Sequence, residues 1–144
     1  MAYEVSVFIE NKIGHLERVT SVLKEAGINI LSMNLNHTAR GWGILNLLVT
    51  RPEEACQLLT GNGITAALRR IVVLAMDDVP GALDDLLKKI ALAGINFTTA
   101  YGRSGHQFGK AWFVMDVNDI PDAEQKMADA GLTLLPDKTI YLPS

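Results

Sequence analysis

The sequence has little of what several classes of functional site require. It contains one cysteine in 144 residues, Cys56, which excludes an internal disulfide framework and a cysteine-based zinc motif. It has no cluster of lysine and arginine, and its net charge of −3 argues against nucleic-acid binding. No apolar run approaches the ~18 residues of a membrane span, and Met1–Val5 carry neither a basic leader nor an apolar signal core. We therefore expect a cytoplasmic protein with no nucleic-acid or membrane partner.

Patterns typical of catalysis and metal binding are also missing. His15, His37 and His106 share no spacing typical of metal ligands, and no nucleophile and base form a recognisable constellation. The glycines around Arg103 resemble a phosphate-binding loop, but the segment lacks the strand–loop–helix context that such a loop needs. We expect this segment to be a hairpin tip, and we expect no enzymatic activity, no metal and no cofactor.

What the sequence does contain is an internal repeat. Gly14-His15-Leu16 matches Gly81-Ala82-Leu83 at an offset of 67 residues, and Ala26–Asn29 matches Ala93–Asn96 at the same offset. Between these anchors, apolar residues recur with the 3.6-residue period of an amphipathic helix in both copies. Each predicted helix ends at the glycine of the second anchor, which supplies the left-handed conformation common after a helix.

Strand patterns flank each predicted helix. A strand precedes it, and a second strand, a glycine-containing turn, a third strand and a second helix follow. Thr50 with Glu53 is typical of a capping box for one of the second helices, and Asp119 is the expected N-cap of the other. The strands expected directly after the first helices are Ile28–Leu35 and Ile95–Ala100.

Each copy is therefore predicted to be a strand–helix–strand–strand–helix–strand unit, the split βαβ of the ferredoxin-like class. We expect an α+β protein made of two ferredoxin-like βαββαβ units, residues 1–69 and residues 70–144. The two units should pack as a pseudo-dimer with antiparallel sheets.

One strand, Ile71–Met76, fits two places in this plan. At the offset of 67 it matches the opening strand near Val5–Ile9, and at an offset of 68 Ile71–Leu74 matches the closing strand Thr139–Leu142. It would thus end the first copy and begin the second. We expect the closing strands to be shortened or exchanged between copies, with Thr139–Leu142 a candidate to complete the first unit.

These residues resemble the ACT-domain family, whose recurrent pattern is an opening strand, a short polar turn ending in Pro-Gly, a Leu-rich helix and then Gly-Ile-Asn. The second copy matches with Asp77-Asp78-Val79-Pro80-Gly81-Ala82-Leu83 and Ala93-Gly94-Ile95-Asn96-Phe97. The first copy matches with Ile13 in place of the proline. The resemblance covers nearly the whole chain, and it implies binding of a free amino acid at a contact between two modules, in a free-standing regulator or a separate regulatory subunit.

The two predicted helix starts have chemistry that suits an amino acid. Unpaired N–H groups and the dipole at a helix N-terminus favour a carboxylate, and Gly14 and Gly81 would let it approach the backbone. Side-chain oxygens of Asn11, Asp78 and the two strand asparagines could accept from the ammonium group. These glycines could instead only relieve tight turns, and the asparagines could simply form turns. The predicted ligand-binding residues are Asn11, Ile13, Gly14, His15, Leu16, Asn29, Ile30, Asp78, Val79, Pro80, Gly81, Ala82, Leu83 and Asn96.

The two helix starts differ in charge. Lys12, His15 and Arg18 surround the first, whereas aspartates surround the second. We expect the Gly14 turn to hold a carboxylate better, unless both sets are solvated surface or one ligand bridges both turns. The aspartates are Asp77, Asp78, Asp84 and Asp85.

Together these patterns predict a non-catalytic sensor of a free amino acid. Apolar and aromatic residues on the nearby strands favour a ligand with a branched or aromatic side chain. Small modules with open strand edges also favour a homodimer or larger assembly. The alternative is a regulatory subunit that acts on a separate metabolic enzyme mainly through protein–protein contact.

Overall fold

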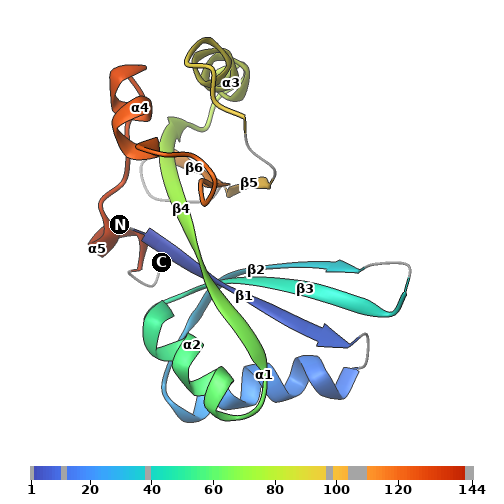
Figure 1. Ribbon diagram of the computed structural model, residues 1–144. Coiled ribbons are helices and arrows are strands. Elements are labelled where there is room, and N and C mark those ends of the chain that lie inside the picture. The colour runs from blue at the N-terminus through green and yellow to red at the C-terminus, as the bar shows by residue number, and fades with distance from the viewer. Residues whose placement is uncertain (1, 11–12, 38–39, 97–98, 104–109, 142–144) are drawn as a thin grey trace. The chain divides into compact units, whose positions relative to one another are not determined.

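The computed structural model describes residues 2–10, 13–37, 40–96, 99–103 and 110–141 (Figure 1). The chain forms two compact units. The N-terminal unit consists of Tyr3–Arg69 with Tyr141–Ser144, and the C-terminal unit consists of Met1–Ala2 with Arg70–Ile140. Each unit is described by itself, and the domain boundary after residue 69 and the packing as a pseudo-dimer stay predictions.

The N-terminal unit has the element order of a ferredoxin-like fold. Its sheet has the strand order β2-β3-β1-β4, and β3 is antiparallel to both of its neighbours. Helices α1 and α2 cover one face of this sheet (Figure 1). The elements are β1 (Ala2–Glu10), α1 (Ile13–Glu25), β2 (Ile30–His37), β3 (Trp42–Val49), α2 (Pro52–Gly61) and β4 (Thr65–Asp77).

Alternation along the strands builds the N-terminal core. Val5, Val7 and Ile9 of β1 face the helices, whereas Phe8 is exposed. The register pairs Val5 with Leu47, so the same face continues across β3. The other core residues are Leu45 and Val49 of β3, Val19 and Leu23 of α1, and Ala55 and Leu59 of α2.

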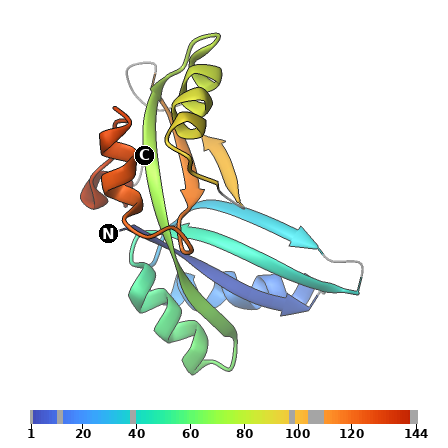
Figure 2. The ribbon, with the colours of Figure 1, turned by 45° about the horizontal axis from the view of Figure 1, so that its top comes forward.

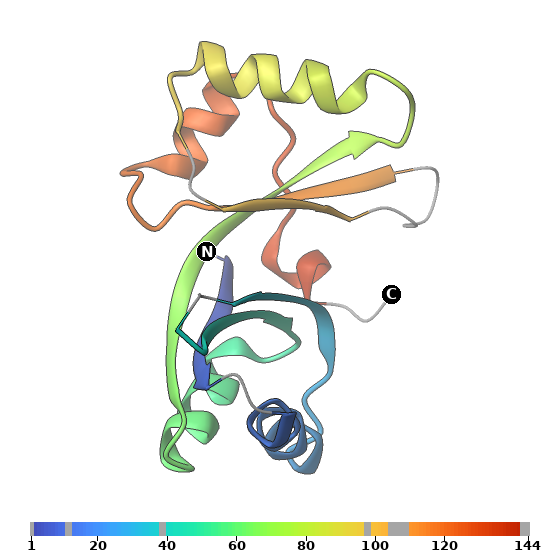
Figure 3. The same ribbon diagram turned by 90° about the vertical axis from the view of Figure 1, so that its right-hand side faces the viewer.

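The C-terminal unit repeats the order. Its sheet has the order β4-β6-β5 with antiparallel pairs, and an isolated antiparallel bridge between Leu74 and Leu134 adds a short fourth position beside β4. Figure 3 shows α3 and α4 on one face of this sheet. The elements after β4 are α3 (Ala82–Leu92), β5 (Ala100–Arg103), β6 (Lys110–Asp116), α4 (Ala123–Asp129) and α5 (Asp137–Ile140). The predicted α+β fold of two ferredoxin-like units with antiparallel sheets is confirmed.

Strand β4 answers the double match of Ile71–Met76. It is one 13-residue strand whose first part belongs to the N-terminal unit and whose second part opens the C-terminal unit. The closing strand of the C-terminal unit is reduced to the bridge at Leu134, where the Ala75 N–H donates to the Thr133 carbonyl (3.0 Å). The strand predicted at Thr139–Leu142 is wrong, because Thr139 and Ile140 lie in α5 and donate to the Pro136 carbonyl. Leu142 lies outside the described residues.

Three smaller predictions are also wrong. Thr50 does not cap α2, because its hydroxyl accepts from the Asn29 N–H (3.1 Å) and Arg51 occupies the N-cap position. Asp122, not Asp119, precedes α4 as its N-cap. The strand expected at Ile95–Ala100 begins only at Ala100, because the Ile95 N–H closes the end of α3 on the Ile90 carbonyl (3.3 Å). The left-handed glycines after α1 and α3 are confirmed, with φ of 70° at Gly27 and 71° at Gly94.

Candidate functional site

A cavity of about 260 Å³ lies at the start of α3 in the C-terminal unit. It brings together four of the predicted site residues, all from the turn between β4 and α3 and from the first turn of α3. Sequence reasoning did not assign the rest of the lining to a site. The lining residues are Met76, Asp77, Asp78, Val79, Ala82, Leu83, Gly102, Arg103 and Ala111.

Strand alternation makes the cavity mainly apolar. Met76 pairs with Ala111, on the same face as the core residue Leu74 and therefore beneath α3. Gly102 lies on this face too, because it pairs with the core residue Phe113. Met76, Gly102 and Ala111 thus form the sheet side of the cavity.

The charged neighbours Asp77 and Arg103 point to the opposite face of the sheet. Asp77 forms an ion pair with Lys110 (2.5 Å between Oδ1 and Nζ), its partner in the strand register. The Arg103 guanidinium lies over the Trp112 ring, 5.6 Å from its centroid. Asp78 is therefore the acidic side chain left on the cavity side of this turn.

The start of α3 supplies backbone donors. Gly81 is the N-cap with a φ of 87°, a conformation that suits glycine, and it has no side chain with which to cap the helix. The Ala82 N–H donates to the Val79 carbonyl (3.2 Å), and the first helical bond runs from the Asp85 N–H to the Gly81 carbonyl (3.0 Å). The N–H groups of residues 83 and 84 lie between these two bonds and point out of the helix, toward its N-terminal end.

In the N-terminal unit the corresponding space is filled by a leucine. Leu35 pairs with Leu45 as Gly102 pairs with Phe113, so Leu35 holds the position of Gly102. Leu35 packs against the core, and a Cβ added to Gly43 would lie 3.3 Å from its Cδ1. The cavity of the C-terminal unit therefore opens where glycine replaces leucine. The offset of 67 residues aligns these two positions in the sequence, and that signal was available.

The predicted residues of the first copy are not gathered at one place. Gly14 is exposed in the first turn of α1, and Leu16 packs against the core behind half-buried His15. Asn29 lies beyond the other end of α1, a helix of 13 residues and hence roughly 20 Å long. Within one unit, Gly14 and Asn29 therefore cannot hold the same small ligand. Asn11 and the side chain of Ile13 lie outside the described part of the chain.

The asparagines occupy separate surroundings. Asn29 and Ile30 line a cavity of about 400 Å³ at the end of α1, together with Thr20, Lys24 and Gly27–Ile28. The Asn29 backbone is already bonded, since its carbonyl accepts from the Thr50 N–H (3.0 Å). Asn96 is exposed after the end of α3, remote from Gly81.

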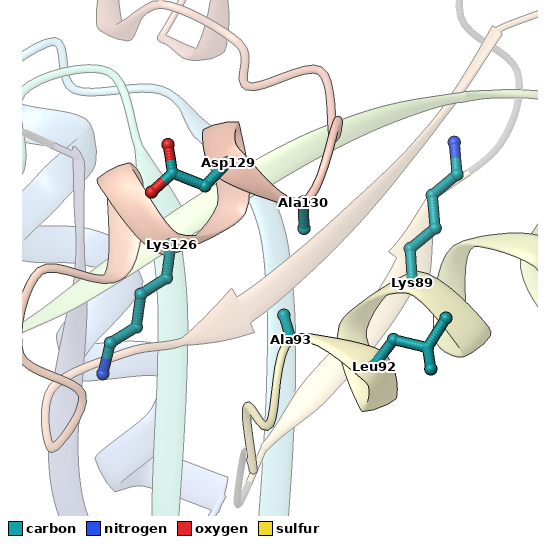
Figure 4. A pocket seen from close by; sticks show the side chains of 6 residues that line it. All are labelled: Lys89, Leu92, Ala93, Lys126, Asp129 and Ala130. Atoms are coloured by element: carbon teal, nitrogen blue, oxygen red, sulfur yellow. The ribbon is translucent and has the colours of Figure 1, made fainter.

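A further cavity of about 360 Å³ lies where the C-terminal ends of α3 and α4 meet (Figure 4). Its two ammonium groups, on Lys89 and Lys126, point away from each other in Figure 4. They do not converge on one anion, and this cavity is a weaker candidate than the one at α3. The lining residues are Lys89, Leu92, Ala93, Lys126, Asp129 and Ala130.

Within the described residues, no group of three His, Cys, Asp or Glu side chains could hold a metal ion. No helix of the described part of the chain is long and apolar enough to cross a membrane.

The architecture and the repeated helix-start turn match a known family. The model of the ACT domain pair matches residues 1–137, so this chain belongs to the ACT domain pair family, as its resemblance predicted. No curated protein matches the sequence.

Solved structures agree with this assignment. The crystal structure of protein BT0572 from Bacteroides thetaiotaomicron is 27% identical and has a TM-score of 0.85, over 97% of this chain and 95% of that chain. The regulatory subunit of aspartate kinase from Thermus thermophilus, in its ligand-free form, is 16% identical with a TM-score of 0.62, over 89% and 91%. The same subunit from Thermus flavus is 14% identical with a TM-score of 0.54, over 90% and 92%. The likeness to these two subunits shows the fold alone.

Proposed function

We propose that this protein is a non-catalytic regulator that binds a free amino acid in the cavity at the start of α3. The observation that carries the proposal is the replacement of the space-filling Leu35 by Gly102 at equivalent positions of the two units. A glycine that opens a cavity beside an uncapped helix start creates room next to unpaired backbone donors. The same turn carries the motif by which the sequence resembles ACT domains.

The lining offers a partner to each part of an amino acid. The N–H groups at the start of α3 suit the carboxylate, and Asp78 suits the ammonium group. Met76, Val79 and Leu83 offer apolar contact to the side chain, which favours a branched or aromatic ligand. Asp84 and Asp85 in the first turn weaken the attraction of this helix end for an anion.

The charge argument from the sequence favours the Gly14 turn, and the cavity favours the Gly81 turn. We place the ligand at the cavity because a filled space cannot admit a side chain, whereas surface charges are screened by salt over about 8–10 Å. Gly14 stays the competing site, and the experiment below separates the two.

The second candidate function is regulation of a separate enzyme by protein–protein contact. The observation in its favour is the similarity in fold to proteins described as regulatory subunits of aspartate kinase. Both candidates include self-association as a homodimer or larger assembly.

The test is a calorimetric screen of the twenty amino acids against the purified chain, repeated with two glycine variants. Gly102→Leu copies the residue of the N-terminal unit and should abolish binding by filling the cavity. Gly14→Leu should leave binding unchanged, because nothing described lies within 4 Å of a Cβ at Gly14. For the wild type, a ligand at 100 times its dissociation constant should add about 2.7 kcal/mol to the free energy of unfolding.

The opposite pattern, with binding lost only in Gly14→Leu, would move the site to the N-terminal unit. Thermal melts unmoved by millimolar concentrations of all twenty amino acids would reject the sensor and leave the protein–protein alternative.

A further inference from the structure

Helix α3 carries a second apolar stripe besides the one that faces the core. Leu86 and Ile90 are buried against the sheet, whereas Val79, Leu83 and Leu87 are 58%, 47% and 37% exposed. The exposed residues recur every four positions and continue to Ala91, so they lie along one side of the helix and its leading turn. Exposed apolar residues that form a contiguous stripe, rather than single scattered ones, mark interaction surfaces.

The fold does not require this stripe, because α1 lacks it. At the offset of 67 residues, Val79, Leu87 and Ala91 correspond to Lys12, Thr20 and Lys24. Only the position of Leu83 is apolar in both units, and its counterpart Leu16 packs against the core. The stripe is therefore a property of the C-terminal unit and not of the βαββαβ plan.

The stripe lies on the side of α3 that is turned away from α4. The side next to α4 is marked by Lys89 and Ala93, which share a cavity with residues of α4 (Figure 4). Leu87 is on the other side of the helix. Figure 2 shows that α3 lies over the part of the sheet formed by β6 and β5, so the stripe borders the β5 edge.

Strand β5 is the last strand of this sheet among the described residues, and it offers backbone groups at its edge. The Asp116 N–H donates to the Thr99 carbonyl (3.0 Å), so residues 99, 101 and 103 direct their backbone groups toward β6. Ala100 and Gly102 alternate with them and direct their N–H and C=O groups outward. Their small side chains leave this edge accessible.

The charges next to the stripe are self-complementary. Asp84 and Lys88 form an exposed ion pair (2.8 Å) one turn apart on α3. If two α3 helices pack antiparallel about a two-fold axis near Leu86 and Leu87, Asp84 of each faces Lys88 of the other. A two-fold contact between identical chains needs such a pairing, whereas a foreign partner does not.

We propose that the apolar stripe of α3 and the edge of β5 form one surface that binds a second copy of this chain about a two-fold axis. The contact pairs the two β5 edges and packs the two α3 stripes against each other, which buries both kinds of exposed group at once. It rests on the homo-oligomer part of the proposed function and is independent of the ligand.

Sedimentation equilibrium of the wild type and of matched lysine variants tests this surface. The wild type should be a dimer at micromolar concentration. Leu87→Lys should raise the dimer dissociation constant at least tenfold, whereas Thr20→Lys, the equivalent change on α1, should leave it unchanged. Circular dichroism melts of both variants show whether the fold is kept.

A charge reversal separates this two-fold contact from other contacts through the same residues. Asp84→Lys should weaken the dimer several-fold by placing two lysines opposite each other, and Asp84→Lys with Lys88→Asp should restore it. A folded Leu87→Lys that dimerises like the wild type overturns the proposal, and so does a double variant no tighter than Asp84→Lys. A wild type that is monomeric at ~100 μM overturns this surface and self-association together, and the calorimetric screen for amino acids is unaffected by that result.

Discussion

The two units share their element order and core positions and differ at the start and along the outer side of one helix. In the N-terminal unit, Leu35 fills the space beside the sheet, and the exposed side of α1 is polar at Thr20 and Lys24. In the C-terminal unit, Gly102 opens a cavity and α3 is apolar at the equivalent positions. The buried residues keep both copies folded, so the difference lies where packing does not constrain the sequence. A repeat of this kind lets one copy supply structure while the other becomes available for binding.

The largest expected effect concerns what the two units have in common. Leu23 and Ile90 hold equivalent buried positions on α1 and α3. Leu23→Ala and Ile90→Ala should each lower the free energy of unfolding by about 2–5 kcal/mol, because each leaves a cavity in a packed core. Urea denaturation followed by circular dichroism measures both. A cost near zero for either variant would show that the two cores are not equivalent.

A smaller effect separates the units. Leu35→Gly should lower the free energy of unfolding by about 2 kcal/mol, through the lost packing and the flexibility of glycine in a strand. The reciprocal Gly102→Leu should change it by less than about 1 kcal/mol, because the side chain enters existing space and a strand glycine is removed. The same urea titrations apply, and equal losses in the two variants would contradict the filled-against-open comparison.

The smallest effect concerns the chain ends. The Tyr141 hydroxyl accepts from the Tyr3 N–H (2.7 Å) and donates to the Tyr3 carbonyl (3.2 Å). Tyr141→Phe should therefore lower the free energy of unfolding by roughly 1–2 kcal/mol, since each hydrogen bond contributes about 0.5–1.5 kcal/mol. Lys138→Ala, an exposed change on α5, serves as the control. No difference between the two variants would mean that the Tyr3 contact does not stabilise the N-terminal unit.

The repeat in the sequence was enough to predict the fold, because helix periodicity and the glycines after α1 and α3 are local signals. The predictions that failed depend on longer-range competition. Thr50 has the composition of a cap, but its hydroxyl is used by the Asn29 N–H of another segment. Thr139 follows Pro136 and Asp137, which begin a short helix where the repeat alone predicts a strand.

The candidate site was predicted only in part, for a related reason. The turn from Asp78 to Leu83 is legible as a motif, so four of its residues could be named in advance. Gly102 becomes informative only when the strand register places it opposite Phe113, in the position that Leu35 holds in the other unit. A single glycine in a strand pattern has many explanations, and the register selects one.

Strand β4 also limits how this sequence can vary during evolution. Ala66 and Leu68 pack against the N-terminal core, and Val72 and Leu74 belong to the C-terminal core, so one even-numbered alternation serves both units. Deleting or inserting one residue near Arg69 would break this phase and turn the apolar side chains of one unit out of its core. Length changes in the middle of this strand should therefore survive in pairs of residues, and an odd change should persist only with a compensating bulge.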